Sequence, residues 1–349
     1  MATEHPPVLA ASPEPLCAFY DVALLDLDGV VYLQEQPVPG ASEALAAARA
    51  AGMRLEFVTN NASRRAPEVA ALLNEVGVPA EPAEIVTSAQ AAAALLAERV
   101  PPGAAVLVVG APALADEIRD VGLVPVDSAD AHPVAVVQGF GPTVGWPQLA
   151  EGAVAVRGGA RWIATNGDLT VPSPRGPLPG NGSLVAAIRT AVGRAPDDIV
   201  GKPHPRLHQE SVRRSGASSP LVVGDRLDTD IEGAVNAGTP SLLVLTGVTR
   251  PEHLLAAPPR RRPSYLAARL DGLLIGHPGV PVAEETRCGP WTARRTGDVI
   301  VLSGNGEPVE ELDALRALCG AAWSASGPPA AVRAEGTRAE VVLAELGLP

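Results

Sequence analysis

Short apolar runs alternate along this chain with alanine-rich segments of helical length, and this alternation limits the fold more than any other feature. Residues 22–32, 54–59 and 220–223 are predicted strands, whereas residues 41–51 and 66–76 are predicted helices that glycines terminate. Strands that alternate with helices are joined by right-handed crossovers and form a parallel sheet with helices on both faces. The sequence therefore predicts an α/β protein with a doubly wound parallel sheet.

The chain has 349 residues, which predicts about two domains. From about residue 87 the alternation continues in a new unit, and Pro and Gly then concentrate at residues 172–182, as is typical of a hinge or linker. The residues after about 276 form a shorter tail, with a predicted strand at 299–302 and predicted helices at 310–319 and 339–346.

Composition excludes several classes of protein. The 27 basic residues are outnumbered by 39 acidic ones, which argues against a general nucleic-acid surface. The long uncharged stretches are broken by Pro and Gly, so none is a predicted membrane span, and the first 15 residues lack the basic start of a signal peptide. The three cysteines cannot form a disulfide framework. We therefore expect a cytoplasmic protein without a nucleic-acid or membrane partner.

Polar residues cluster where four predicted strands or loops end. The carboxyl ends of parallel strands open onto the ligand crevice of such a sheet, so clusters that are distant in sequence can meet there. Several carboxylates in one crevice repel each other unless a cation is present, and hard oxygen ligands suit Mg²⁺. The four clusters are Asp26 with Asp28, Thr59 with Asn60, Lys202, and Asp225 with Asp230.

The two aspartates of the first cluster suit phosphoryl transfer. Asp26 can attack phosphorus in line and form an aspartyl phosphate. Asp28, two residues further along the predicted strand, points the same way and can protonate the leaving alkoxide and then deprotonate water. Asp225 completes the predicted metal site, and Asp230, one helical turn later, can orient the ligands from behind.

The other two clusters suit phosphate binding. Thr59 and Asn60 end a strand at a turn, where a hydroxyl and backbone N–H groups can hold phosphoryl oxygens. Lys202, the single lysine of the chain, can neutralise charge on the nucleophile and the phosphoryl group. His204 and His208 lie four residues apart, and we expect surface positions or the rim of a phosphate site for them rather than metal binding.

Each short pattern also has an ordinary structural interpretation. An Asp-x-Asp pair and a Thr-Asn-Asn sequence are frequent in turns, and Gly-Lys-Pro commonly opens a loop. Gly-Asp followed by a second Asp can be the capped and charge-compensated start of a helix. The order of the four clusters, each after its own strand or loop, favours the catalytic interpretation.

The chain resembles the phosphatases of the haloacid dehalogenase (HAD) superfamily, on the motifs DLDGV at 26–30, TNN at 59–61, GKPHP at 201–205 and GDRLDTDI at 224–231. The large insertion between the second and third motifs is similar to that of the subgroup with a C2-type cap. Four further motifs narrow the resemblance to the NagD-like class IIA phosphatases. They are ATNGD at 164–168, GNGSLVAAI at 180–188, AVNAG and LVLTG. The long chain and its tail most resemble the actinobacterial glycerol 3-phosphate phosphatases.

The resemblance implies a domain organisation. Residues 16–87 and 181–275 would form the phosphatase core, and residues 88–180 an α/β cap that covers the crevice and supplies specificity. Residues 276–349 would form a small α+β extension similar to part of an acetyltransferase. Arg294-x-x-Gly297 is followed by Asp298 and Val299, so the loop that binds a coenzyme A pyrophosphate is incomplete, and we expect the extension to be non-catalytic.

The resemblance also implies roles for single residues. Asp26 matches the nucleophile and Asp28 the general acid and base; Asp26, the backbone carbonyl of Asp28 and Asp225 match the Mg²⁺ ligands, with Mn²⁺ or Co²⁺ able to substitute. Thr59, Asn60 and Lys202 match the phosphate binders. Asp168 can accept hydrogen bonds from the hydroxyls of a polyol, although a capped turn is an equal alternative.

The expected activity is hydrolysis of a small phosphorylated metabolite, with glycerol 3-phosphate or glycerol 1-phosphate favoured by the resemblance, which also implies recycling of glycerophospholipid polar heads. Pyridoxal phosphate, nucleotides and sugar phosphates remain alternative substrates. A phosphotransferase would use the same aspartyl phosphate with an alcohol as acceptor, and a non-catalytic binding module would retain only the fold. A homodimer is compatible with each of these functions.

Overall fold

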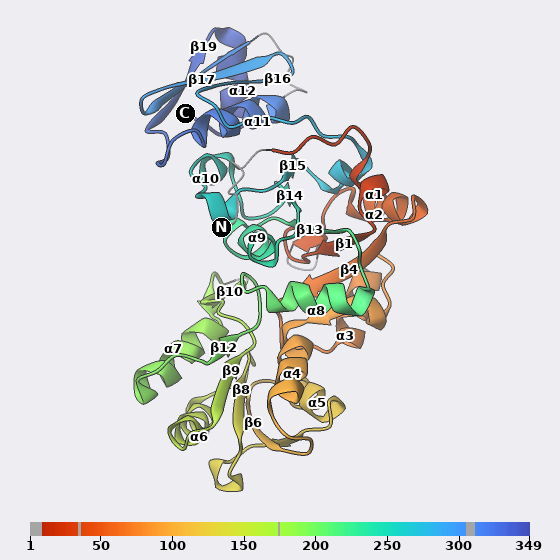
Figure 1. Ribbon diagram of the computed structural model, residues 1–349, viewed down its shortest axis with the longest axis vertical. Helices are drawn as coiled ribbons and strands as arrows, with labels where there is room; N and C mark the ends of the chain where they lie inside the picture. The colour runs from red at the N-terminus through yellow and green to blue at the C-terminus, as the bar shows by residue number, and fades with distance from the viewer. Residues whose placement is uncertain (1–8, 34–35, 174, 305–310) are drawn as a thin grey trace. The chain divides into compact units, whose positions relative to one another are not determined.

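The computed structural model describes residues 9–33, 36–173, 175–304 and 311–349. These residues form two compact units (Figure 1). The first unit contains the described residues up to Leu33, residues 37–55 and the described residues from Ala217 onward, and the second contains Gln36 and residues 56–216. The helices and strands follow the alternation that the sequence predicts, and the α/β class is confirmed.

Four parallel strands of the first unit lie side by side in the order β15-β14-β13-β1. They are β1 (Val22–Leu25), β13 (Pro220–Gly224), β14 (Ser241–Val244) and β15 (Tyr265–Ala267). Every residue of β1 and β14 is buried, as expected for central strands with both faces covered. Because the strands are parallel, the loops that follow Leu25, Gly224 and Val244 start at the same edge.

Short elements surround these strands. The helices of this part are α1 (Leu16–Phe19), α2 (Ala41–Ala50), α9 (Glu232–Ala237) and α10 (Pro251–Leu255), and the short strands are β2 (Tyr32–Leu33) and β3 (Gln36–Pro37).

The last 65 residues or so form a small α+β layer that belongs to the first unit. Strands β16 (Glu285–Cys288), β17 (Trp291–Thr296), β18 (Val299–Gly304) and β19 (Ala331–Glu335) make one sheet, and helices α11 (Glu311–Ala322) and α12 (Thr337–Glu345) pack against it.

The extension shares a hydrophobic core with the strands of the first unit. Leu254 and Leu266 belong to the same buried cluster as Trp291 and Trp323. Trp323 Nε1 donates to Leu254 O at 3.0 Å, and Arg316 Nη2 donates to Leu266 O at 2.7 Å. The extension is therefore built into the first unit rather than tethered to it.

A five-stranded parallel sheet in the order β12-β9-β8-β6-β7 forms the centre of the second unit. Helices α4 (Ser88–Arg99) and α5 (Pro112–Asp120) lie on one side of this sheet, and α6 (Trp146–Arg157) and α7 (Asn181–Val192) lie on the other (Figure 1). Trp162 is fully buried in its core, and its Nε1 donates to Gln138 Oε1 at 3.1 Å. The strands are β6 (Ala105–Val109), β7 (Val124–Val126), β8 (Ala135–Gln138), β9 (Arg161–Ala164) and β12 (Asp198–Ile199).

The remaining elements of this unit connect or flank that sheet. Strand β4 (Arg54–Thr59), whose last four residues belong to this unit, pairs through Phe57, Val58 and Thr59 with β5 (Ile85–Thr87). The helices are α3 (Ala66–Glu75), α4 (Ser88–Arg99), α5 (Pro112–Asp120), α6 (Trp146–Arg157), α7 (Asn181–Val192) and α8 (Arg206–Ser215).

One prediction about local structure is wrong. The predicted strand at residues 22–32 ends at Leu25, because Gly29 adopts a positive φ of 83° and turns the chain, so that its N–H donates to Tyr32 O at 2.8 Å. Asp28 therefore does not follow Asp26 along a strand. The segment 172–182 follows β10 (Thr170–Val171) and includes β11 (Leu178–Pro179), which pairs with β10, and the start of α7 at Asn181. Its role as a hinge or linker stays a prediction.

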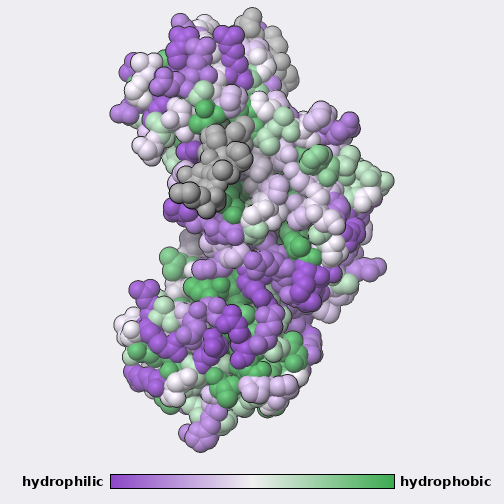
Figure 2. All heavy atoms as spheres, viewed as in Figure 1, coloured by the Kyte–Doolittle hydropathy of each residue, from purple (hydrophilic) through white to green (hydrophobic). Residues whose placement is uncertain are grey.

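None of the helices in the described part of the chain is long and apolar enough to cross a membrane. The face drawn in Figure 2 is a mixture, with hydrophobic groups interspersed among hydrophilic residues.

Candidate active site

Three aspartates of the first unit converge at the edge where its strands end. Asp26 follows β1 and donates its N–H to Val223 O at 2.8 Å, and Asp225 follows β13. Asp230 lies in the turn Leu227–Ile231, which connects β13 to α9. Each of the three residues offers a carboxylate oxygen within 4.8 Å of the others. The convergence that the sequence predicted for Asp26 and Asp225 is therefore present.

The fold fixes the carboxylate of Asp225 tightly. Asp225 is fully buried, and the N–H of Val248 donates to its Oδ2 at 2.6 Å. A Cβ on Gly247 would lie 1.9 Å from this Oδ2, and a Cβ on Gly29 would lie 2.5 Å from it. Two glycines thus leave the space that the carboxylate occupies. Thr246, next to Gly247, donates its hydroxyl to Gly29 O at 2.5 Å and joins the two loops.

Asp230 is held just as closely. It is buried, and the N–H of Arg226 donates to its Oδ2 at 3.0 Å. A Cβ on Gly224 would lie 2.2 Å from Asp230 Cβ, so the close approach of the turn to β13 requires glycine.

The side chain of Asp28 does not belong to the acidic cluster. Asp28 is exposed, whereas Asp26 is half-buried, and Asp28 forms an isolated bridge with Tyr32. Its exposed carboxyl is accessible to solvent and to a bound molecule.

The donor set of the cluster fits a divalent cation that prefers oxygen. Two unit charges 4.8 Å apart repel by about 3 kcal/mol at an effective dielectric constant of about 20. Three carboxylates at this separation are therefore unfavourable unless a positive charge lies among them, and carboxylate oxygens are the ligands that Mg²⁺ takes from proteins.

In the second unit, Asn60 connects two predicted site residues that lie more than 100 positions away in sequence. Its Nδ2 donates to Asp168 at 3.1 Å (Oδ2) and 3.3 Å (Oδ1) and to Lys202 O at 3.1 Å, and its Oδ1 accepts from Lys202 N at 2.8 Å. The structure thus brings Asn60, Asp168 and Lys202 together. The Asn60 side chain fixes the backbone at Lys202 and the carboxylate of Asp168.

Lys202 is 3% exposed, and its Nζ donates to Val58 O at 3.2 Å. Thr59, the next residue after Val58, is buried, and its Oγ1 accepts from Asn61 N at 3.1 Å. The hydroxyl hydrogen of Thr59 can therefore still be donated. The ammonium group of Lys202, from the loop before α8, thus contacts the end of β4, next to Thr59.

The expectation that His208 lies on the surface or at a rim is wrong. His208 is 1% exposed, because it lies on the inner face of α8. Burial and the neighbouring positive charge of Lys202 lower the pKa of His208 to about 3, so its imidazole is neutral at physiological pH.

Several residues that position the site were not singled out in the sequence. Asn166 Nδ2 and Ser88 Oγ both donate to Asn60 O, at 2.7 and 2.6 Å, and Asn181 Nδ2 donates to Asn166 O at 2.8 Å. Asn166 and Asn181 lie in the motifs ATNGD and GNGS, which were noted but not given a role. No sequence pattern marks Ser88, whose contact depends on the path of the chain.

Comparison with known proteins identifies the class. The model of the haloacid dehalogenase-like hydrolase family matches residues 23–124, and a HAD-hydrolase-like model matches residues 199–273. A model of the GCN5-related N-acetyltransferase-like domain matches residues 288–348. Together with the relatives described next, these matches show that the chain belongs to the haloacid dehalogenase-like hydrolases, and the predicted family is confirmed.

Two curated relatives and one crystal structure extend this comparison. The chain is 48% identical over 313 residues to the D-glycerol 3-phosphate phosphatase of Mycobacterium tuberculosis, covering 88% of this chain and 86% of the relative. It is 37% identical over 238 residues to a 5′-nucleotidase of Bacillus subtilis, covering 67% and 91%. A glycerol phosphate phosphatase of M. tuberculosis, solved in complex with magnesium, matches with a TM-score of 0.88 and 45% identity over 97% of this chain and 100% of that one.

Proposed function

We propose that this protein is a Mg²⁺-dependent phosphomonoesterase that hydrolyses glycerol 3-phosphate or glycerol 1-phosphate. The convergence of Asp26, Asp225 and Asp230 carries the proposal, because it supplies a nucleophile and a cation site in one place. The relative that is 48% identical over most of both chains supports the substrate.

Asp26 is the proposed nucleophile and Asp28 the proposed general acid and base. A carboxylate oxygen of Asp26 attacks phosphorus, the bond to the substrate oxygen breaks, and Asp28 gives its proton to the leaving alkoxide. Asp28 then takes a proton from water, whose oxygen attacks the aspartyl phosphate, releases phosphate and regenerates Asp26. The exposed position of Asp28 allows it to exchange protons with solvent between these steps.

The metal ligands of the proposal are Asp26, Asp225 and the backbone carbonyl of Asp28, with Asp230 in support. A bound Mg²⁺ supplies positive charge that offsets the carboxylates and the phosphoryl oxygens. Gly29 and Gly247 keep the Asp225 carboxylate in the orientation that this role needs.

Thr59, Asn60 and Lys202 are the proposed phosphate binders. The hydroxyl of Thr59 donates to a phosphoryl oxygen, and the ammonium group of Lys202 offsets its charge. The side-chain amide of Asn60 is engaged with Asp168 and Lys202, so we infer that it acts mainly by holding these two residues.

Asp168 is the proposed specificity residue. Its carboxylate accepts both hydrogen bonds from Asn60 Nδ2 and is half-buried, and the substitution of Gly180 or Gly182 would bring a Cβ to 2.4 Å or less from the backbone of its loop. An ionised carboxylate accepts hydrogen bonds, which suits the hydroxyls of glycerol.

We also propose the domain division into a core of residues 16–87 and 181–275, a specificity cap of 88–180, and a non-catalytic extension of 276–349. The extension's shared core with Leu254 and Leu266 supports a structural role for it. We expect a cytoplasmic enzyme that acts on a small metabolite, without nucleic-acid or membrane partners. Light scattering measures the molar mass in solution and tests whether the protein is a homodimer.

The test is phosphate release from a panel of metabolites with Mg²⁺, with Asp26→Asn as the blank. The panel contains both enantiomers of glycerol 3-phosphate, pyridoxal phosphate, 5′-nucleotides and sugar phosphates. We expect the highest kcat/KM for a glycerol phosphate. A higher value for another class assigns that substrate instead, and release by Asp26→Asn at the wild-type rate overturns the mechanism.

Two further arms sharpen the result. Asp168→Ala should raise KM for glycerol phosphate more than for p-nitrophenyl phosphate, and equal effects on both would reject Asp168 as a specificity residue. An added acceptor alcohol distinguishes a phosphotransferase, because it would divert phosphate from water to the alcohol.

A further inference from the structure

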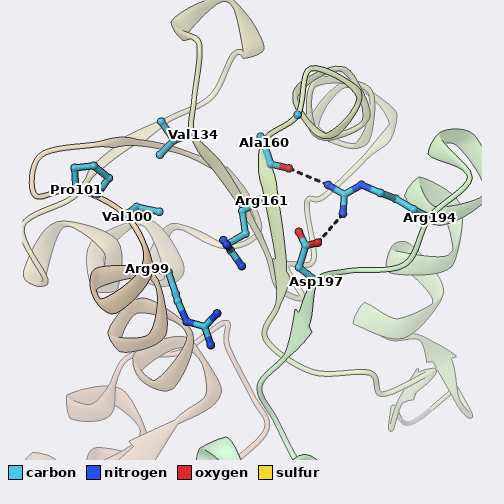
Figure 3. Close-up of a pocket in the computed structure, with 9 residues that line it drawn as sticks. Arg99, Val100, Pro101, Val134, Ala160, Arg161, Arg194 and Asp197 are labelled. Carbon is cyan, nitrogen blue, oxygen red and sulfur yellow. Dashed lines mark hydrogen bonds and ion pairs between the residues drawn. The ribbon is translucent and has the colours of Figure 1, made fainter.

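The second unit contains a pocket of about 380 Å³ at the edge of its sheet where the strands begin (Figure 3). Residues just before β6, β8, β9 and β12 line it. The loops with Asp168 and Lys202 follow β9 and β12 at the opposite edge. The pocket is therefore separate from the proposed phosphate binders of this unit.

Three arginines line the pocket, and the protein leaves two of them weakly compensated. Arg194 donates to Ala160 O at 2.9 Å and to Asp197 Oδ1 at 3.1 Å, so it is fixed at the wall (Figure 3). Arg161 Nη1 lies 4.0 Å from Asp198 Oδ2. The side chain of Arg99, at the end of α4, makes no ion pair or hydrogen bond with any residue that the structure describes.

The single acid that lines the pocket is already neutralised. Asp197 accepts from Arg194 and, through its Oδ2, from Trp162 N at 2.7 Å. Arg99 and Arg161 therefore give the pocket an excess of positive charge in a chain of net charge −12. A concave site with charges of one sign concentrates ions of the opposite sign.

The shape and lining define the chemistry of a ligand. A guanidinium group presents paired N–H donors that match the oxygens of a phosphate. Val100, Pro101 and Val134 form an apolar wall beside the arginines. The volume lies at the lower end of the range for small-molecule sites.

We propose that this pocket binds a small phosphate-bearing anion, with Arg99 and Arg161 as its donors and Arg194 held in place by Asp197. The lining has no candidate nucleophile or pair of carboxylates, so the pocket is a binding site for an effector and not a second catalytic site.

The experiment titrates the metal-free full-length protein with inorganic pyrophosphate by calorimetry. The variants are Arg99→Gln/Arg161→Gln and a control of equal charge change, Arg119→Gln/Arg157→Gln, whose arginines are exposed on the same unit but do not line the pocket. We expect the pocket pair to lose one equivalent of bound pyrophosphate or to weaken that site by about 10-fold or more. The control pair should bind like the wild type.

Turnover of p-nitrophenyl phosphate without added pyrophosphate reports the catalytic site, and it should be equal in all three proteins. Because Arg99 has no described partner, Arg99→Gln alone should fold normally and still weaken the site. Wild-type binding in the pocket pair, equal weakening in the control pair, or no equivalent beyond the catalytic one in the wild type would each overturn the proposal.

Discussion

Substitution of Gly247 by Ala tests whether the position of the Asp225 carboxylate determines metal binding. The new Cβ would lie 1.9 Å from Asp225 Oδ2 and 2.5 Å from its Cγ, whereas ordinary contacts begin at about 3.4 Å. The carboxylate must therefore move by about 1.5 Å, and the hydrogen bond from Val248 N, 2.6 Å long, would break.

The expected loss follows from these two changes. A hydrogen bond to a charged group contributes about 1.5–3 kcal/mol, which corresponds to a decrease in Mg²⁺ affinity of about 10–100-fold if the displaced carboxylate no longer binds well. A shift of about 1 Å in a catalytic group costs about 100-fold in turnover. Overpacking should also destabilise the fold by about 1–3 kcal/mol.

The assay is a Mg²⁺ titration by calorimetry together with the Mg²⁺ dependence of p-nitrophenyl phosphate turnover. Gly327→Ala is the matched control, because a Cβ on Gly327 meets nothing within 4 Å. Circular dichroism verifies that both variants are folded. If folded Gly247→Ala binds Mg²⁺ and turns over substrate as Gly327→Ala does, the argument from the position of the carboxylate is refuted.

Three other predictions concern buried side chains. Lys202→Met should lower kcat/KM by about 100-fold or more, while Arg214→Met, on the exposed face of α8, leaves it unchanged. The pKa of His208 is about 3 in the folded protein, so between pH 6.5 and about 3 the unfolded chain binds one proton more than the folded chain. The free energy of unfolding therefore falls as the pH is lowered through this window, by up to about 1.4 kcal/mol per pH unit. His208→Phe should reduce this pH dependence, as measured by urea unfolding. Trp323→Ala should cost about 3–5 kcal/mol in the same assay, whereas Trp146→Ala, at a side chain 79% exposed, should cost less than about 0.5. A Trp323→Ala variant as stable as Trp146→Ala would show that the extension does not support the first unit.

The C-terminal extension shows which elements a sequence pattern can predict and which it misses. One strand and two helices were expected after residue 276, and β18, α11 and α12 correspond to them. Strands β16, β17 and β19 were missed. In β17, for example, the exposed Arg294 and the buried Arg295 interrupt any apolar run. β17 and β19 pair with β18, and β16 pairs with β17, so their place in the sheet depends on pairing between strands, which is not a local property.

The acidic cluster, too, was predictable from the sequence only in part. The apolar runs are visible in sequence, and the polar residues that accompany them located Asp26 and Asp225 correctly at one edge. The exclusion of the Asp28 side chain from the cluster depends on the turn at Gly29, whose positive φ no apolar pattern records.

The sequence by itself determined the α/β class, the order of the motifs along the chain and the residue types available for chemistry, because periodicity and motif order are local properties of the chain. Tertiary structure alone decided which of these groups make contact: the Asn60 side chain with the Lys202 backbone across 142 positions, and Arg99 with Arg161 in the lining of one pocket. The physical reason is that contacts between residues far apart in the sequence depend on how the loops close and how the helices pack. The distances between such residues are set only when the whole core has formed.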